Sequence, residues 1–413
     1  MNENRQIDVV IIGGGPAGLS AGIELKKLGV SRIVIIEREE ETGGIPRYCG
    51  HSPFGMREFK RVLSGKQYAN KLTKQAQKEG VEIWLSTNVV KAQKNGKLLI
   101  TNNDGLKEIK AKRVIYATGV RETPRSARLI SGTRAQGVLN TGALQTMIYR
   151  QKLRPFKRPI IIGTELVAFS AIMTCLHAKI KPVAMIEESS NVIARWPSSI
   201  FPRLTNVPLF FNTSLVNIKG DTQVSAVEVE DNNGRREIKC DGVILTGKFI
   251  PEASLARCGH LEIDPLTNGL KVDQFGRCSD PTYFATGNVL RPVETAGWSW
   301  KEGKECAKIV AKDLAGRALI SDEEVQIIAS DALIKYIMPQ KITLPFSPDF
   351  GVENLQLRFL QKTSGNLIAL SDEKVIFEQK INVTPERRVL VPIKKLLEKY
   401  NNSGQIIFKF TRN

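Results

Sequence analysis

The stretch DVVIIGGGPAGLSAGIELKKLGVSRIVIIE, residues 8–37, decides the fold of the first part of the chain. It begins with an apolar run, Val9 to Ile12, that leads into the glycine-rich turn GGGPAG, residues 13–18. An amphipathic stretch continues to Leu28, and a second apolar run follows at Ile33 to Ile36. This order of short apolar runs around a helical stretch predicts a strand, a helix and a second strand in one β-α-β unit.

The turn carries the residue types that a dinucleotide site needs. Gly13 permits the tight turn, Gly15 lets the backbone approach a pyrophosphate, and Gly18 lets the helix lie close to the strand. The N–H groups and the positive dipole end of the helix then face the phosphate charge, and Glu37 can accept hydrogen bonds from a ribose. A tight turn without a ligand is the alternative, but the flanking strand, helix and acid favour the site. The predicted binding residues of this segment are Gly13, Gly15, Pro16, Ala17, Gly18, Glu37 and Arg38.

The composition excludes several classes of protein. A chain of 413 residues is expected to form about two to four domains. No apolar run approaches the ~18 residues of a membrane helix, and residues 1–7 lack the apolar core of a signal peptide, which predicts a cytoplasmic protein. Six cysteines without a CxxC pair and three scattered histidines argue against a disulfide scaffold and against a metal site.

The formal charge of +18 concerns partners rather than fold. Lys and Arg are dispersed, and no basic helix with interleaved aromatic residues is present, so the pattern argues against nucleic-acid binding. The charge instead favours an acidic partner protein or peripheral contact with an anionic membrane surface.

Three further segments resemble flavoproteins of the glutathione-reductase type. Gly43-Gly44, after the acidic strand end, is similar to the glycine pair that gives the cofactor access to the backbone in that family. RVIYATG, residues 113–119, resembles the strand and turn that close the first half of the flavin domain. PTYFATGN, residues 281–288, resembles the late motif whose acid binds the ribityl chain, although here an asparagine replaces the acid. The resemblance implies FAD as cofactor and adds the binding residues Gly44, Ala117, Thr118, Gly119, Gly287 and Asn288.

A second unit of the same kind lies between these segments. Ile160 to Ile162 and Val183 to Ile186 are predicted strands, and Leu166 to Ala178 is the helix between them. In the family this domain holds a nicotinamide dinucleotide. However, the turn Gly163-Thr164-Glu165 has a carboxylate where the second glycine should stand, and that side chain would obstruct and repel a pyrophosphate.

Glu165 has an alternative role, which is to satisfy the N–H groups at the start of its own helix. Glu187 and Glu188, at the end of the second strand, further disfavour a 2′-phosphate. NAD(P) binding to the second domain is therefore left open but disfavoured.

The pattern predicts an α/β fold with two Rossmann-like domains and a small β-rich addition. Residues 1–125 and 246–330 form the two parts of the FAD domain, and residues 126–245 form the inserted NAD(P)-like domain. Residues 331–413 contain short β-type runs separated by turn signals, which indicate a separate β domain, for example a sandwich. Flavin binding does not require this domain, and its strand edges are natural surfaces for a partner.

A narrower resemblance rests on four segments together, GGIPRYCGHSPFG, ATGVRETPRSARLISG, GTELVAFSA and RPVETAGWSWKEGK. They resemble the nucleotide-binding, alpha-type flavoprotein subunit of bacterial multi-subunit dehydrogenases, the group of opine oxidase, hydrogen cyanide synthase and hydroxyproline dehydrogenase. The likeness covers roughly residues 7–316. Many such subunits carry clustered cysteines for an iron–sulfur centre, whereas this chain does not. The resemblance thus implies a heteromer with a second flavoprotein subunit, and any iron–sulfur cluster on another chain.

The candidate catalytic pair is Cys49 with His51, just beyond the glycine pair. A histidine can hold a nearby thiol as the reactive thiolate, but one cysteine cannot form the disulfide of a disulfide reductase. The alternative is a packed thiol with His51 bonded to backbone or flavin. Arg47 is a candidate for the flavin pyrophosphate or an anionic substrate, with an ordinary surface arginine as the alternative.

These observations predict an FAD-dependent oxidoreductase, in which the protein positions the cofactor and the cofactor transfers hydride and electrons. The favoured function is a dehydrogenase subunit that acts on an amino-acid or hydroxy-acid substrate and passes electrons between flavin centres. The alternatives are a stand-alone NAD(P)H-dependent reductase and a non-catalytic nucleotide-binding scaffold subunit.

Overall fold

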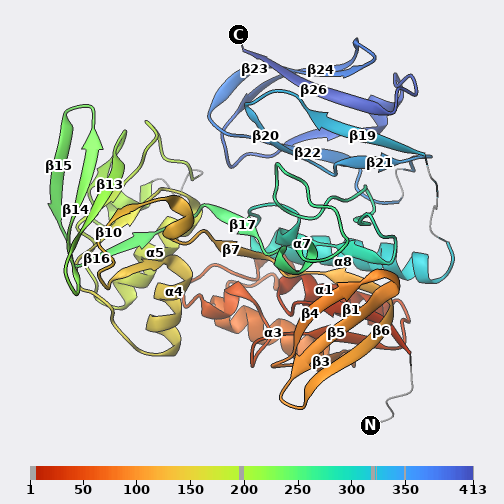
Figure 1. Cartoon of the computed structure of the whole chain (residues 1–413), viewed down its shortest axis with the longest axis horizontal. Helices are drawn as coiled ribbons and strands as arrows, with labels where there is room; N and C mark the ends of the chain where they lie inside the picture. The colour runs from red at the N-terminus through yellow and green to blue at the C-terminus, as the bar shows by residue number, and fades with distance from the viewer. Residues whose placement is uncertain (1–5, 195–199, 318–320, 322, 348–349, 413) are drawn as a thin grey trace.

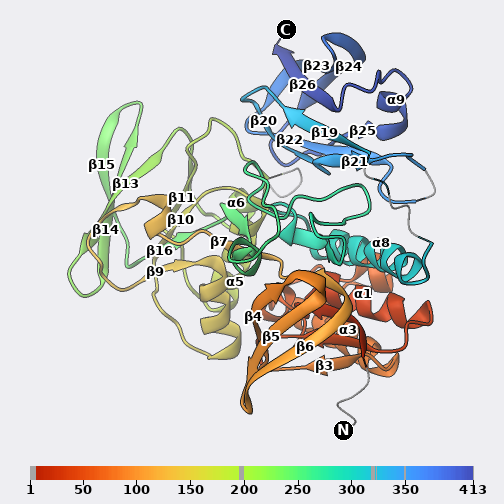
Figure 2. The same ribbon diagram turned by 45° about the vertical axis from the view of Figure 1, so that its right-hand side comes forward.

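A computed structural model describes residues 6–194, 200–317, 321, 323–347 and 350–412. Figure 1 shows the first dinucleotide-type domain in red and orange, the second beside it in yellow and green, and the β-rich domain in blue. The β-rich domain lies over helix α8 (Ala296–Leu314), which returns to the first domain. Figure 2 keeps this arrangement after a 45° turn, so the two dinucleotide-type domains lie side by side under one β-rich domain.

The first domain is built on the predicted β-α-β unit. Strand β1 (Ile7–Ile12) pairs in parallel with β2 (Ile33–Ile36) and with β6 (Gly105–Tyr116). Helix α1 (Pro16–Lys27) begins within the glycine-rich segment, directly after Gly15. The sheet order is β3-β2-β1-β6-β5-β4, and β18 pairs with β6. The remaining elements are β3 (Glu82–Trp84), β4 (Asn88–Gln93), β5 (Lys97–Asn102), β18 (Tyr283–Ala285), η1 (Ile45–Tyr48), α2 (Met56–Phe59), α3 (Gly65–Lys78) and α7 (Ser254–Arg257).

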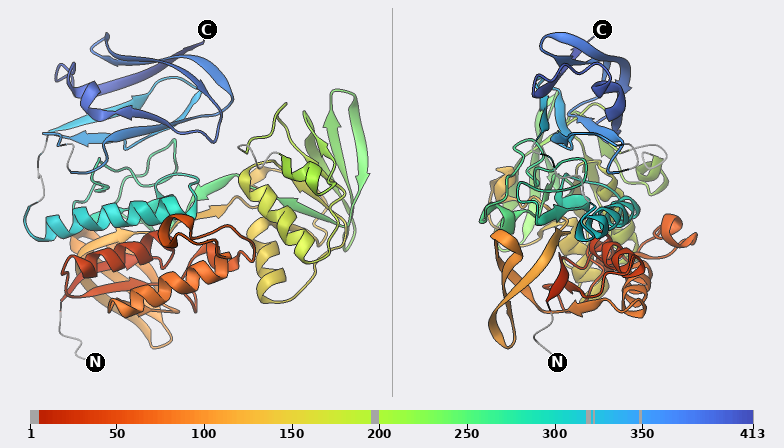
Figure 3. Two further views of the ribbon diagram at one scale, coloured as in Figure 1. Left: turned by 180° about the vertical axis from the view of Figure 1, so that it is seen from behind. Right: turned by 90° about the vertical axis from the view of Figure 1, so that its right-hand side faces the viewer.

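The central strands are apolar on both sides because both faces of the sheet are covered. Val10 and Ile12 belong to one buried cluster, whereas Val9 and Ile11 belong to another on the opposite face. Figure 3 shows α8 in cyan and α1 and α3 in red and orange on the same face. A continuous apolar run is the pattern expected of such a parallel strand.

The second domain repeats this plan, as predicted. Its sheet order is β12-β11-β10-β16-β9, with β10 (Pro159–Ile162) parallel to β11 (Ala184–Ile186). Helix α5 (Leu166–His177) follows the second glycine turn. The other elements of this sheet are β9 (Val138–Asn140), α4 (Thr141–Gln145), the π-helical η4 (Thr146–Arg150), α6 (Phe201–Leu204), β12 (Leu209–Phe210) and β16 (Gly242–Leu245).

A separate four-stranded sheet extends the second domain in the order β15-β14-β13-β8. A turn joins β14 to β15, because β14 ends at Asp231 and β15 begins at Gly234. Residues 217–220 complete strand β13 and lie opposite β14. The strands are β8 (Ser131–Gly132), β13 (Ser214–Gly220), β14 (Val224–Asp231) and β15 (Gly234–Lys239).

Two short antiparallel strands join the dinucleotide-type domains. Strand β7 (Val120–Glu122) leaves the first domain and β17 (Phe249–Pro251) returns to it. The predicted boundaries at residues 125 and 245 therefore lie close to this paired crossing.

The C-terminal domain is a sandwich of two sheets around one apolar cluster. It begins at β19 (Glu324–Ala329), earlier than the predicted boundary at residue 331. The five-stranded sheet has the order β21-β19-β26-β23-β24 and the three-stranded sheet β20-β22-β25. The other elements are β20 (Ile334–Met338), β21 (Lys341–Thr343), β22 (Asn354–Phe359), β23 (Thr363–Ser371), β24 (Lys374–Val383), β25 (Val389–Pro392), α9 (Ile393–Leu397) and β26 (Gln405–Arg412).

The sandwich is docked on the first domain through buried polar contacts. Gln274 and Thr343 exchange two hydrogen bonds, with the Gln274 side chain donating to one carbonyl at 2.6 Å and accepting from one N–H at 2.8 Å. Arg358 of β22 forms an ion pair with Glu294, and both side chains are buried. These contacts indicate that the domain stabilises the first one, because its removal would strip a buried charge of its partner, while the expectation that flavin binding does not require it stays a prediction. Among the described helices, none is long and apolar enough to span a membrane.

Candidate functional site

The first glycine turn has the three properties expected of its glycines. A Cβ on Gly13, which has φ of +108°, would lie 2.5 Å from the carbonyl oxygen of Ala117. A Cβ on Gly18 would lie 1.9 Å from the Gly13 oxygen, so only glycine lets the helix approach the strand. At Gly15 the nearest atom to an added Cβ is 3.9 Å away, on Gly44. Gly15 therefore borders open space, as a pyrophosphate site requires.

The start of helix α1 adds positive potential to this space. Gly15 is the N-cap and Pro16 the first helical residue, no side chain caps the helix, and its first turn carries no acid. The glycine pair closes the other side, because Gly44 has φ of +58° and a Cβ there would lie 3.0 Å from the Gly15 Cα. These features fit a dinucleotide phosphate between the helix start and the glycine pair.

Glu37 stands at the carboxyl end of β2 and holds the turn in place. Its Oε2 accepts a hydrogen bond from the Gly14 N–H at 2.8 Å, and its Oε1 accepts from the Glu39 N–H at 3.1 Å. The carboxylate is buried beside the turn. A contact between Glu37 and a ribose stays a prediction. The position of Glu37 beside the phosphate site is consistent with that contact.

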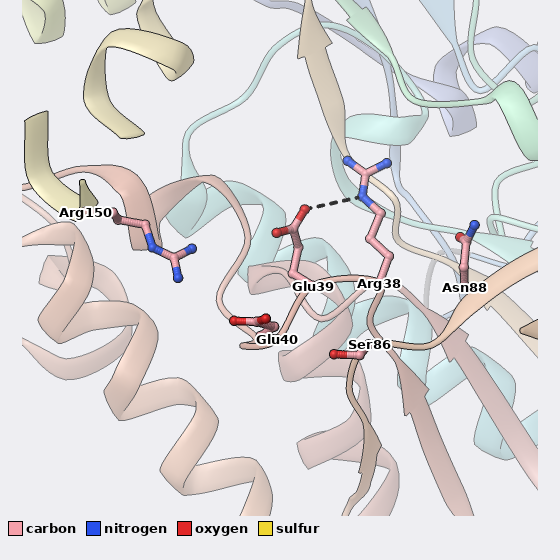
Figure 4. A pocket seen from close by; sticks show the side chains of 6 residues that line it. All are labelled: Arg38, Glu39, Glu40, Ser86, Asn88 and Arg150. Carbon is pink, nitrogen blue, oxygen red and sulfur yellow. Dashed lines mark ion pairs between the residues drawn. The ribbon is translucent and has the colours of Figure 1, made fainter. Parts of the chain in front are cut away.

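A pocket of about 450 Å³ lies directly beyond Glu37, where the adenosine of a bound dinucleotide would extend. Figure 4 shows Glu39 and Glu40 between Arg38 on one side and Arg150 on the other. Arg150 comes from η4 of the second domain, so both dinucleotide-type domains line the pocket. The residues that line it are Arg38, Glu39, Glu40, Ser86, Asn88 and Arg150.

Arg47 is not the ordinary surface arginine that was considered as the alternative, while its contact with the flavin pyrophosphate or an anionic substrate stays a prediction. It is buried rather than on the surface, and its guanidinium donates to the Glu41 carbonyl and the Tyr48 hydroxyl. Its ion-pair partners are Glu39, at 3.5 Å, and Glu41, at 4.0 Å. Arg47 thus anchors the loop between β2 and η1, and its charge is met within the protein.

The other predicted cofactor residues gather at the carboxyl ends of the parallel strands. The Ala117 N–H donates to Ile12 and the Thr286 N–H to Tyr116, which brings the ends of β1, β6 and β18 together. Gly287 touches the start of α1, since a Cβ there would lie 2.8 Å from the Ala17 Cβ.

Two of these residues use their side chains within the protein. The Asn288 amide donates to the Glu294 carbonyl at 3.0 Å and accepts from the Glu294 N–H at 2.8 Å. Thr118 donates to the carbonyl of Glu252 at 2.6 Å, and the Glu252 N–H donates to the Gly119 carbonyl. These bonds shape the strand ends, while flavin contacts by Thr118, Gly119 and Asn288 stay predictions.

Cys49 and His51 lie in one hydrogen-bonded chain, but they do not bond each other directly. The Cys49 thiol donates to the Gln145 Oε1 at 3.5 Å, and the Gln145 Nε2 donates to the Ser170 hydroxyl at 2.7 Å. Ser170 in turn donates to the His51 Nε2, whose Nδ1 faces the Ser52 carbonyl at 3.2 Å. The Ser52 carbonyl can only accept, so Nδ1 carries a proton, and the lowered pKa of His51 favours the neutral ring whose Nε2 accepts from Ser170.

Protonation of the thiol follows from this environment. Burial raises the pKa of Cys49 to about 12, and burial also lowers the pKa of His51. A neutral imidazole three hydrogen bonds away cannot hold a thiolate, so the geometry favours the packed, protonated thiol over the candidate thiolate–imidazole pair. Gln145 and Ser170 come from α4 and α5, so this network joins the second domain to the first.

The second glycine turn differs from the first in the way the sequence predicts. The Glu165 carboxylate fills the space beside the turn, where a Cβ on Gly247 would lie 1.4 Å from its Oε2. It accepts a hydrogen bond from the Lys248 N–H at 3.2 Å, and burial raises its pKa. Glu165 does not cap α5, so the alternative role considered for it is wrong. Instead, Glu386 of the C-terminal domain accepts from the Leu166 N–H at 3.3 Å.

The acid at the end of β11 is also engaged. Thr164, which replaces the middle glycine of the first turn, donates its hydroxyl to the Glu187 Oε2 at 2.6 Å. The same hydroxyl accepts from the Ile193 N–H at 3.0 Å. Thr164 and Glu165 of the second turn therefore bond to neighbouring segments of the protein and do not fit a nicotinamide dinucleotide, whereas the residues of the first turn fit FAD.

Sequence reasoning missed Gln145, Ser170 and Glu386. Ser170 lies within the quoted segment GTELVAFSA, but nothing in that segment marks it, and Gln145 and Glu386 belong to no motif. Each is an ordinary polar residue that reaches the site only through the packing of a distant segment.

Comparison with known proteins agrees with this geometry. The profile of the pyridine nucleotide-disulphide oxidoreductase family matches residues 7–303. A 34.2 kDa protein in the rubredoxin operon of Clostridium pasteurianum is 25% identical over 281 residues, which cover 64% of this chain and 85% of that protein. One of the opine oxidase subunits of Rhizobium meliloti (strain 1021) is 24% identical over 188 residues, which cover 44% of this chain but only 39% of that protein.

Among solved structures, thioredoxin reductase of T. acidophilum has the same two-domain fold. Its TM-score is 0.64 at 22% identity, and the match covers 75% of this chain and 99% of that one. The open phosphate site at Gly15, the engaged Glu37 and the family match over residues 7–303 lead to one conclusion. The chain belongs to the pyridine nucleotide-disulphide oxidoreductase family and is an FAD-dependent oxidoreductase.

Proposed function

We propose that the chain is the FAD-carrying subunit of a multi-subunit dehydrogenase. In this proposal the complex oxidises an amino-acid or hydroxy-acid substrate, and electrons pass between the FAD of this chain and the flavin of a second subunit. The observation that carries the proposal is the contrast between the two glycine turns. The first is open at Gly15, whereas Glu165 fills the second.

The contrast matters because a self-sufficient reductase needs a second reaction partner for its flavin. A nicotinamide dinucleotide would have to displace the Glu165 carboxylate from its bond to the Lys248 N–H. A disulfide would need two cysteines near the flavin, yet Cys49 is a single thiol whose pKa burial raises to about 12. A protein partner that brings its own redox centre meets this need without either group.

The residues of this chain supply binding and orientation. The N–H groups at the start of α1 would hold the FAD pyrophosphate, and Glu37 would hold the adenosine ribose. The backbone at Gly44 would lie against the cofactor. Bound FAD supplies the hydride and electron transfer itself.

Two further findings support a partner subunit. The relative in Rhizobium meliloti is one subunit of opine oxidase. The formal charge of +18 suits a partner with an acidic face, and such complementarity raises the association rate more than the final affinity.

Co-expression with a candidate second flavoprotein subunit tests the proposal. We expect a complex to co-purify and to reduce an artificial dye with an amino-acid or hydroxy-acid substrate, while the single chain binds FAD but turns over none. Full turnover by the single chain with dye would contradict the proposal. A chain that binds FAD which dithionite cannot reduce would instead support a nucleotide-binding scaffold.

A stand-alone NAD(P)H-dependent reductase is the second candidate, and the complete Rossmann-like fold of the second domain favours it. Anaerobic mixing of the FAD-loaded single chain with NADH and with NADPH decides between the two. Under the subunit proposal the flavin bleaches slowly and incompletely, because Glu165 stands in the phosphate position. Rapid bleaching by micromolar NADH would replace the subunit proposal with this candidate.

A further inference from the structure

The loop that connects β24 to β25 touches both dinucleotide-type domains. We refer to residues 384–388 as the bridging loop. In it, the Glu386 Oε1 accepts a hydrogen bond from the Leu166 N–H of α5 at 3.3 Å. Two residues further on, the Arg388 guanidinium lies 3.9 Å from the ring centre of Trp298 on α8. A single loop of the C-terminal domain thus contacts α5 in the second domain and α8 in the first.

The Leu166 N–H is the position at which a dinucleotide phosphate would bind. Leu166 is the first residue of α5, as Pro16 is the first residue of α1, and each follows its glycine turn directly. N–H groups at such a helix start point toward a bound anion and favour negative charge. In the second domain that anion is the Glu386 carboxylate.

The charges around this contact come from the second and the C-terminal domains. Lys335 of β20 attracts both Glu165 and Glu386, and its pKa is lowered because desolvation outweighs this attraction. Arg128 also attracts Glu165 and donates to the carbonyls of Thr246 and Gly247 at 2.8 and 2.7 Å. The carboxylates are thereby matched by cations within the protein, as a bound phosphate would be matched in a nucleotide site.

The other end of the bridging loop is held firmly. The Trp298 indole lies between two guanidinium groups, with Arg57 4.0 Å from the ring centre and Arg388 3.9 Å from it. Arg388 also lies 3.7 Å from the Glu294 carboxylate. Cation–π contacts of one ring with two guanidinium groups fix the loop against the first domain.

We propose that the bridging loop is a built-in occupant of the second dinucleotide site. The Glu386 carboxylate takes the place of a dinucleotide phosphate at the start of α5, and Glu165 fills the adjoining space. The C-terminal domain thereby excludes nicotinamide dinucleotides and fixes the second domain relative to the first. The proposal goes beyond the subunit function and requires no partner chain.

Hydrogen exchange in the FAD-loaded full chain tests the docking. Glu386→Ala removes the acceptor of the Leu166 N–H, and we expect peptides at the start of α5 to exchange about tenfold faster or more. Glu378→Ala is the matched control, since Glu378 is an exposed carboxylate of the same domain, on β24. Exchange at the start of α5 that is equal in the Glu386→Ala variant and the control would overturn the proposal.

Binding of NADH, followed by calorimetry, tests the exclusion. Glu165→Gly removes one obstacle, and the double variant Glu165→Gly/Glu386→Ala removes both. We expect the double variant to bind NADH at least about tenfold more tightly than Glu165→Gly alone, because a carboxylate no longer competes for the helix start. Equal binding by the two variants would overturn the exclusion. Neither measurement involves a second subunit, so failure here is separate from failure of the subunit function.

Discussion

Three glycines of one turn look equivalent in sequence, yet they differ in what surrounds them. Gly18 borders the Gly13 carbonyl, where an added Cβ would lie 1.9 Å away, whereas Gly15 borders open space. Gly15 has φ of −78°, which any residue can adopt. A side chain at Gly15 is therefore tolerated by the protein and opposed only by the cofactor.

This difference gives a prediction that separates binding from folding. Gly15→Leu is expected to leave the thermal unfolding of the FAD-free chain nearly unchanged while it weakens FAD binding by at least about tenfold, because the side chain occupies the pyrophosphate space. Gly18→Ala, in contrast, is expected to destabilise the FAD-free chain itself. Flavin content after gel filtration and the midpoint of thermal unfolding measure the two effects. A Gly15→Leu protein that keeps its full flavin content would show that the cofactor binds elsewhere.

The six cysteines differ in reactivity because of burial. Cys258 is exposed, whereas Cys49 is buried and its raised pKa keeps it protonated at neutral pH. We expect iodoacetamide at about pH 8 to modify Cys258 in the native chain and to reach Cys49 only on unfolding. Mass spectrometry of the modified peptides checks this. Fast modification of Cys49 in the native chain would restore its role as a reactive thiolate.

The same pKa fixes the sign of a pH effect. The folded Cys49 thiol keeps its proton up to about pH 12, whereas the unfolded thiol loses it near the ordinary value of 9.0. Between these values the unfolded chain binds fewer protons than the folded chain, so the free energy of unfolding falls as pH rises. The stabilisation that the raised pKa of Cys49 contributes is fully present below pH 9.0 and is lost as the pH rises from there to about 12. Cys49→Ala is expected to reduce that alkaline loss in urea unfolding.

At the scale of elements, α5 is the part of the second domain that other segments hold. Ser170, in the middle of α5, accepts a hydrogen bond from Gln145 and donates one to His51. The N–H of Leu166, the first residue of α5, donates to Glu386. These contacts come from the second, first and C-terminal domains respectively. The position of α5 therefore depends on all three domains at once.

Ser170→Ala tests the central contact of this helix. Removing the hydroxyl leaves the Gln145 amide and the His51 Nε2 without their shared partner, which is expected to lower the free energy of unfolding by about 1–2 kcal/mol. Urea unfolding measures the change, and Ser225→Ala, at an exposed position on β14, is expected to stay within about 0.5 kcal/mol. An effect of Ser170→Ala no larger than this control would mean that the network contributes nothing to stability.

At the scale of the whole molecule, the C-terminal sandwich supports the flavin domain. Arg358 of β22 pairs with Glu294, whose backbone holds the Asn288 amide. Both members of the ion pair are buried, with 9% and 5% of their side chains exposed. Breaking one side of a buried pair leaves an uncompensated charge in a poorly solvated place.

Arg358→Ala is accordingly expected to lower the free energy of unfolding by about 3 kcal/mol, at the low end for a buried pair because Arg388 stays near Glu294. Arg235→Ala breaks an exposed pair with Glu230 and is expected to cost less than about 0.5 kcal/mol. Urea unfolding of both variants compares their free energies of unfolding. The flavin content of each variant shows whether the position of Asn288, which the Glu294 backbone holds, matters for FAD binding. Equal costs would show that the sandwich contributes little to the first domain.

The sequence by itself determined the parts of this protein whose chemistry is local. The strand, glycine turn, helix and acidic strand end of residues 8–37 are contiguous, so apolar periodicity and turn chemistry identify them without any tertiary contact. The obstructing Glu165 was recognisable for the same reason. A side chain at the second glycine position of such a turn blocks the approach of a pyrophosphate, whatever surrounds the turn. The C-terminal β domain was predicted as a whole, but β19 lies before the predicted boundary at residue 331.

Only the tertiary structure decided what each site residue bonds. Cys49 and His51 are two residues apart, yet Gln145 and Ser170 of the second domain separate them in the hydrogen-bonded chain. Glu386 meets the Leu166 N–H from 220 positions away. Such contacts depend on how whole domains pack, and packing is set by the shapes of surfaces assembled from distant segments rather than by the neighbours of a residue in the chain. For this reason the phosphate site at Gly15 could be identified from the sequence, whereas the carboxylate at the second helix start became visible only once the chain was folded.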